Sequence, residues 1–143
     1  MVNPIKCLTT MYKPLSEKES DRQAALSMVY ESVKDRMNLS FDDFQDALKD
    51  WEVIPLEEQG WIIGGVLSKE NEVHIGYGIK PLSSIRGHLK ATLKKVLDKY
   101  GSAVTSVMQE NRKGINFCKR LGFIEFKQEK GKIYLKCDRC NYV

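Results

Sequence analysis

Residues 111–123 are Asn111-Arg-Lys-Gly-Ile-Asn-Phe-Cys-Lys-Arg-Leu-Gly-Phe123, and this stretch predicts a short capped helix that ends in a glycine and leads into a strand. Asn111 is typical of a helix N-cap, and Gly122 of the left-handed residue that ends a helix. Apolar residues between them recur at the spacing of one helical face: Ile115, Cys118 and Leu121. Such a helix is common in α/β domains, so the elements around it decide the fold.

The surrounding sequence predicts an alternation of strands and helices. Alternating or β-branched apolar residues predict strands at residues 5–12, 51–56, 61–67, 73–80, 103–108, 123–126 and 133–135. A capping box at Ser16 and Glu19 predicts a first helix. Its apolar stripe comprises Ala25, Met28, Val29, Val33 and Met37. Asn38 or Ser40 caps a second helix from Phe41 to about Trp51, and Ser83 or Ser84 caps a third that Gly101 stops.

The length and composition favour one α/β domain over residues 1–143. The chain is 42% hydrophobic and 29% charged, which suits a single core. No apolar run reaches the roughly 20 residues that cross a bilayer, and the N-terminus lacks the layout of a signal peptide. We therefore expect a soluble cytoplasmic protein that makes no membrane contact.

The net charge of +4 is unevenly distributed along the chain. Residues 1–83 carry 9 lysines and arginines against 14 acidic residues, whereas residues 84–143 carry 14 against 5. The C-terminal part would attract a polyanion, either a phosphorylated cofactor or a nucleic acid. Lysines on solvated helix surfaces explain the same count, and the basic half lacks the interleaved aromatics of a base-stacking platform. Nucleic-acid binding is accordingly the weakest of the functional hypotheses.

The cysteines do not predict a metal site. Cys137 and Cys140 form a C-x-x-C pair, which is half of a zinc site, and neither histidine lies at ligand spacing from it. Reduced thiols at a chain end are the expected state of this pair.

The stretch at residues 111–123 resembles the fourth-helix motif of the GNAT N-acetyltransferase superfamily, N-x-x-A-x-x-F-Y-x-x-x-G-F. Gly114 stands at the Ala position and Cys118 at the Tyr position. The predicted order β-α-α-β-β-β-α-β-α-β-β is also the order of that family. The resemblance implies a mixed sheet that splays open between residues 73–80 and 103–108, with acetyl-coenzyme A in the gap.

The resemblance also implies where the cofactor binds. The family carries Q/R-x-x-G-x-G/A at the start of the third helix, where backbone amides hold the pyrophosphate. Residues 84–91 fit that pattern in no register, because Leu89 stands where a small residue is needed. Side-chain charge would then replace backbone contact. The resulting cofactor-binding candidates are Ile79, Ser84, Arg86, Gly87, His88, Lys90, Asn111 and Phe117.

Acyl transfer from a thioester to an amine needs a base for the amine and an acid for the departing sulfur. His74 and Tyr77 are the candidate bases, with Glu72 a further candidate on the alternation of His74. Cys118 stands where many family members use a Tyr as the acid. A cysteine on a helix face is more often a core residue, and a strand histidine more often has no catalytic role.

The resemblance predicts an acetyl-coenzyme A-dependent N-acetyltransferase, and the acceptor would be a small-molecule or protein amine. The alternative is a GNAT scaffold without transferase activity. Small phage-encoded GNAT-like proteins, some of them internal virion proteins, keep the motif ending and lose the glycine loop as this chain does. GNAT-like Mom proteins modify adenine in phage DNA, so a role related to DNA modification belongs to the same alternative.

Overall fold

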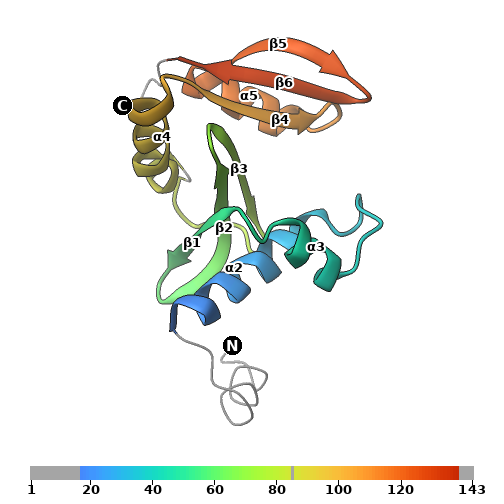
Figure 1. The fold of residues 1–143 in the computed structure, drawn as a ribbon, viewed down its shortest axis with the longest axis vertical. Coiled ribbons are helices and arrows are strands. Elements are labelled where there is room, and N and C mark those ends of the chain that lie inside the picture. Colours follow the sequence, from blue (N-terminus) through green and yellow to red (C-terminus); the bar gives the residue numbers. More distant parts are fainter. Residues whose placement is uncertain (1–16, 85, 139–143) are drawn as a thin grey trace.

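The computed structural model describes residues 17–84 and 86–138 (Figure 1). Four helices and six strands lie within these residues: α2 (Glu17–Val33), α3 (Phe41–Ala47), β1 (Glu52–Glu58), β2 (Trp61–Lys69), β3 (Glu72–Tyr77), α4 (Arg86–Tyr100), β4 (Ala103–Met108), α5 (Arg112–Leu121), β5 (Ile124–Glu129) and β6 (Lys132–Cys137). Their order confirms the α/β prediction from the first helix onward. The strand expected at residues 5–12, and the Ser16 half of the capping box, lie outside the described residues.

The stretch at residues 111–123 folds as its sequence predicts. The Asn111 side chain accepts a hydrogen bond from the Gly114 amide at 3.1 Å, and Gly122 adopts the left-handed conformation with φ of 107°. Ile115 and Leu121 are buried in the core beneath the helix. The cap, the stop and the apolar face therefore position α5 against the sheet.

Several predicted boundaries are wrong. Strand β1 extends to Glu58 instead of residue 56, and β5 extends to Glu129 instead of residue 126. Helix α2 ends at Val33, so Met37 lies in the following turn, although its side chain still packs with the apolar residues under α2. Helix α3 keeps its Ser40 cap but ends at Ala47 instead of near Trp51. Strand β3 ends at Tyr77, and Ile79 beyond it is 48% exposed. The last backbone hydrogen bond from this segment to β2 runs from the Gly78 amide to the Ile63 carbonyl. The apolar alternation in the sequence therefore continues to Ile79, beyond the last residue that pairs with β2.

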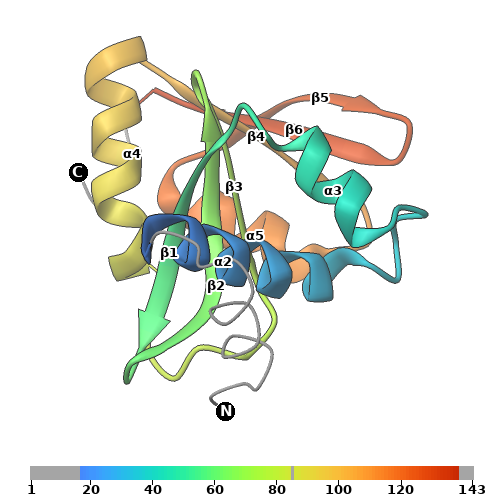
Figure 2. The ribbon, with the colours of Figure 1, turned by 60° about the horizontal axis from the view of Figure 1, so that its bottom comes forward.

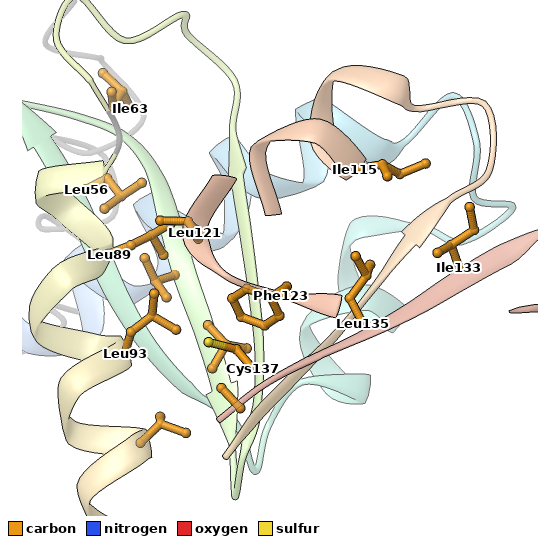
Figure 3. Close-up of a cluster of buried hydrophobic side chains, with 14 residues drawn as sticks. Leu56, Ile63, Leu89, Leu93, Ile115, Leu121, Phe123, Ile133, Leu135 and Cys137 are labelled. Atoms are coloured by element: carbon orange, nitrogen blue, oxygen red, sulfur yellow. The ribbon is translucent and has the colours of Figure 1, made fainter. Parts of the chain in front are cut away.

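One six-stranded mixed sheet, in the order β1-β2-β3-β4-β6-β5, divides the molecule into layers (Figure 2). Helices α2 and α3 cover one face of β1–β3, over a cluster of Leu26, Val29, Phe44 and Leu67. Helices α4 and α5 cover the other face, over a larger cluster (Figure 3). Leu89 and Leu93 of α4, and Leu121 and Phe123 at the end of α5, belong to it.

The sheet parts between β3 and β4. These parallel strands pair at a single position, Glu72 with Val104, and the Val104 amide donates to the Asn71 carbonyl at 2.8 Å. The neighbouring antiparallel pairs, β2 with β3 and β4 with β6, each run over six positions. Beyond their first residues β3 and β4 diverge (Figure 1), which confirms the gap expected between residues 73–80 and 103–108. None of the helices described is long and apolar enough to span a bilayer.

Candidate active site

A hydrogen-bonded histidine lies just past the point where β3 and β4 separate. The His74 Nε2 atom is 2.6 Å from Oε2 of Glu72, two residues earlier on the same face of β3. This hydrogen bond is the main reason why the pKa of the Glu72 carboxyl is lowered. An ionised carboxylate only accepts hydrogen bonds, so Nε2 of a neutral His74 must carry the hydrogen. The lone pair is then on Nδ1.

That lone pair faces the other half of the sheet. His74 Nδ1 is 3.5 Å from Oγ1 of Thr105 on β4, and the Trp51 ring lies 5.8 Å from the imidazole centroid. Sequence reasoning did not single out Thr105 or Trp51. Thr105 lies in a β-branched strand and Trp51 before another strand, and neither position carries a local signal of contact with a residue 31 or 23 positions away. His74 therefore bridges the gap between β3 and β4, with its basic atom toward β4.

A small cavity of about 40 Å³ opens beside this histidine. That volume accommodates one or a few water molecules. Residues from both sheet halves and from α4 and α5 line it: Val73, His74, Ile75, Leu89, Leu93, Thr105, Phe117, Cys118, Leu121 and Phe123. Three of the predicted site residues, His74, Phe117 and Cys118, thus meet at one place.

Cys118 lies on the side of α5 that faces this cavity. Its side chain is partly buried and packs against the larger core cluster. Burial raises the pKa of the thiol to about 11, because the apolar surroundings disfavour the thiolate. The thiol therefore keeps its proton across the neutral range. The Arg120 guanidinium lies over the ring of the neighbouring Phe117, 6.0 Å from the ring centroid.

The other residues predicted on β3 and α5 lie outside this group. Tyr77 and Ile79 are exposed at and beyond the end of β3, and neither lines the cavity. Asn111 uses its side-chain oxygen to cap α5. Any cofactor contact by Asn111 would thus involve its remaining amide group or its backbone.

The segment before α4 is held by an acidic residue that sequence reasoning missed. The carboxylate of Glu58, at the end of β1, accepts hydrogen bonds from the Leu82 amide (2.7 Å), the Ser83 amide (3.1 Å) and the Ser83 hydroxyl (2.6 Å). The bond from the Ser83 hydroxyl is the largest of several causes that lower the pKa of Glu58 to about 2. No local pattern links Glu58 to residues 24 and 25 positions later.

The predicted cofactor residues on α4 are exposed or partly exposed, whereas Leu89 between them is buried. Gly87 and Lys90 are exposed, and a Cβ atom at Gly87 would meet nothing within 4 Å. His88 lies 3.8 Å from Glu58, and the Ser84 hydroxyl accepts a bond from the Arg86 amide. Leu89 is 4% exposed and points into the core (Figure 3). Because the Leu89 side chain packs in the core, it does not obstruct a ligand bound at the N-terminus of α4.

The described residues contain no cluster of three or more histidine, cysteine or acidic side chains that could hold a metal ion. Cys137 is buried at the end of β6, whereas Cys140 lies outside the described residues.

No protein-family model matches the sequence, and no curated protein matches it. Solved structures do. A Pyrococcus horikoshii protein superposes with a TM-score of 0.63 at 15% identity, over 89% of this chain and 94% of its own. A PaiA N-acetyltransferase from Thermoplasma acidophilum, in complex with coenzyme A, gives 0.59 at 14% identity, over 82% and 92%. A GNAT family acetyltransferase from Elizabethkingia anophelis, with acetyl-coenzyme A bound, gives 0.58 at 15%, over 78% and 88%.

This chain has the GNAT fold. At such identities the likeness concerns the fold and not the activity. The fold predicted from residues 111–123 and the order of elements is therefore confirmed, and the chemistry of the site has to be argued from its own residues.

Proposed function

We propose that this GNAT-fold chain is an N-acyltransferase that moves the acetyl group of acetyl-coenzyme A to an amine. The observation that carries the proposal is the meeting of His74, Phe117 and Cys118 at the cavity where β3 and β4 part. A histidine whose Nδ1 lone pair faces β4, 3.5 Å from the Thr105 hydroxyl, and a protonated thiol are the base and the acid that this transfer needs. Two proteins of the same fold contain coenzyme A or its acetyl form.

In the proposed reaction, acetyl-coenzyme A supplies an activated acyl carbon. His74 Nδ1 takes a proton from the attacking amine, directly or through a water in the cavity, while Glu72 holds the ring through Nε2. The nitrogen–carbon bond forms and the carbon–sulfur bond breaks. Cys118 returns a proton to the departing sulfur, and its thiol is available because burial keeps it protonated. Tyr77 is the alternative proton carrier at the end of β3.

The cofactor would extend from this cavity toward the N-terminus of α4. The backbone of residues 77–80, including Ile79, would hold the pantetheine arm. The exposed Gly87 leaves room for phosphate, and positive charge comes from Arg86, His88 and Lys90. Ser84 would contact the cofactor at the start of α4, and Asn111 and Phe117 would contact it from α5. The acceptor is an amine of a small molecule or protein, recognised by residues 16–51 and 128–132. We expect the protein to act in the cytoplasm.

Ligand stabilisation tests the proposal directly. Acetyl-coenzyme A that binds only the folded state should raise the melting temperature, with about 2.7 kcal/mol of stabilisation at a hundred times Kd. Free thiol should then be released when polyamines, lysine peptides and aminoglycosides are offered as acceptors. Absence of a thermal shift and of calorimetric heat at millimolar acetyl-coenzyme A would contradict the proposal.

Cys118→Ala should lower kcat by roughly tenfold, less than the roughly 10²-fold or more that is typical of a general acid, because a thiol with a raised pKa is a weak one. Thiol release from acetyl-coenzyme A between pH 6 and 9 measures this. Cys118→Tyr is the companion variant, since a phenol restores the acid of the family motif. Overpacking of the 40 Å³ cavity by the phenol should cost about 1–3 kcal/mol of stability. If Cys118→Ala matches the wild type at every pH, water or Tyr77 is the acid.

A GNAT scaffold without transferase activity is the second candidate function. The observation that favours it is the size of the cavity, which at about 40 Å³ holds no thioester arm without movement of the surrounding elements. A phage structural or accessory protein, or one involved in DNA modification, would need no such movement. Such a protein would release no thiol, and the Cys118 variants would differ from the wild type in stability alone.

A further inference from the structure

The backbone amides ahead of α4 are already bound to an anion, and this anion belongs to the protein. Both oxygens of the Glu58 carboxylate are used: Oε1 accepts from the Leu82 amide, and Oε2 from the Ser83 amide and hydroxyl. The Glu58 side chain is only 11% exposed, and His88 Nε2 approaches Oε2 at 3.8 Å. Three donor groups of the loop thus hydrogen-bond one carboxylate, and His88 of the first turn of α4 lies close to it.

Such a set of donors recognises anions in general. Successive backbone amides before a helix and the positive end of its dipole favour phosphate as well as carboxylate oxygens. Hydrogen bonds to an ionised acceptor are short and about twice as strong as neutral ones. The low pKa of Glu58, about 2, agrees with a carboxylate that is stabilised in its charged form at this position. A phosphate that approaches the loop therefore meets donors already in use, together with one negative charge.

We propose that Glu58 is an internal competitor for the anion site before α4: its carboxylate occupies the Leu82 and Ser83 donors, and a diphosphate binds there only when Glu58 leaves. That the diphosphate is part of coenzyme A rests on the proposed function. That the donors form an anion site rests on the Glu58 contacts alone. Only molecules in which the carboxylate has moved away can bind the external anion. The apparent affinity for that anion is therefore reduced in proportion to the fraction of such molecules.

Inorganic pyrophosphate is the probe, followed by calorimetry and by the amide NMR signals of Leu82 and Ser83. Glu58→Gln removes the charge and keeps the shape, so we expect pyrophosphate to bind about tenfold more tightly than to the wild type. Glu57→Gln is the matched control, because it removes the same charge from the adjacent, exposed side chain. Glu57→Gln should bind pyrophosphate with the affinity of the wild type. In each protein that binds pyrophosphate, the amide NMR signal of Ser83 should shift when it binds.

Ser83→Ala provides a second test. It removes the hydroxyl that donates the 2.6 Å bond, so in the Glu58→Gln background, where the donors are open to an external anion, it should weaken pyrophosphate binding a few-fold. The proposal is overturned if Glu58→Gln and Glu57→Gln bind pyrophosphate equally, or if pyrophosphate binds to none of the proteins. If pyrophosphate behaves as expected while acetyl-coenzyme A neither binds nor reacts, the competitor role stands and the acyltransferase proposal fails.

Discussion

Replacement of His74 by glutamine should lower kcat by about 10²- to 10³-fold, because a positioned general base contributes that much to acyl transfer. Gln keeps a donor toward Glu72 but has no basic lone pair to take the place of Nδ1. The rate of thiol release with saturating acetyl-coenzyme A and amine measures the loss.

His88→Gln is the matched control for this result, since His74 and His88 are the only two histidines in the chain. His88 lies beside Glu58 at the N-terminus of α4, where the phosphates of the cofactor would bind. Removal of the His88 imidazole should therefore change KM for acetyl-coenzyme A and leave kcat within a few-fold. A His74→Gln enzyme with wild-type kcat would remove His74 from the mechanism.

The parts of the fold that the sequence predicted well depend on local chemistry. Asn111 caps α5 and Gly122 ends it because side-chain and backbone preferences within one or two turns determine both. Ser40 caps α3 for the same reason. The alternation at β3 placed Glu72 and His74 on one face, and their hydrogen bond follows from that placement. These features involve residues close together in sequence, where spacing is informative.

The parts that it missed depend on distant partners. Strand β3 ends at Tyr77 although β2 continues past Gly64, its pairing partner, so neither the apolar spacing around Ile79 nor the length of β2 encodes this end. Thr105 meets His74 across 31 residues and Glu58 meets Ser83 across 25, and neither contact leaves a local pattern. Met37 shows the intermediate case, because the sequence predicted it on the apolar stripe of the first helix, and it packs against the same cluster although it lies beyond the end of α2. Site residues of this kind become visible only when the elements are placed in space.

The position of the Leu89 side chain decides between two interpretations of the sequence before α4. The sequence left open whether this side chain obstructs a phosphate or faces the core, and the structure places it in the core between α4 and the sheet. Leu89→Gly should therefore reduce the free energy of unfolding by about 3–5 kcal/mol, through the cavity that it leaves and the poor helix propensity of glycine. Urea unfolding followed by circular dichroism measures the change.

Ala91→Gly separates the two contributions to this loss. Ala91 is exposed two residues along the same helix, so its replacement carries the helix-propensity cost of about 1 kcal/mol and no cavity. The difference between the two variants is the packing energy of the Leu89 side chain. If Leu89→Gly costs no more than Ala91→Gly and tightens the binding of acetyl-coenzyme A, then Leu89 blocks the phosphate site. In that case the missing glycine of the family motif, and not Glu58, is what weakens the cofactor loop.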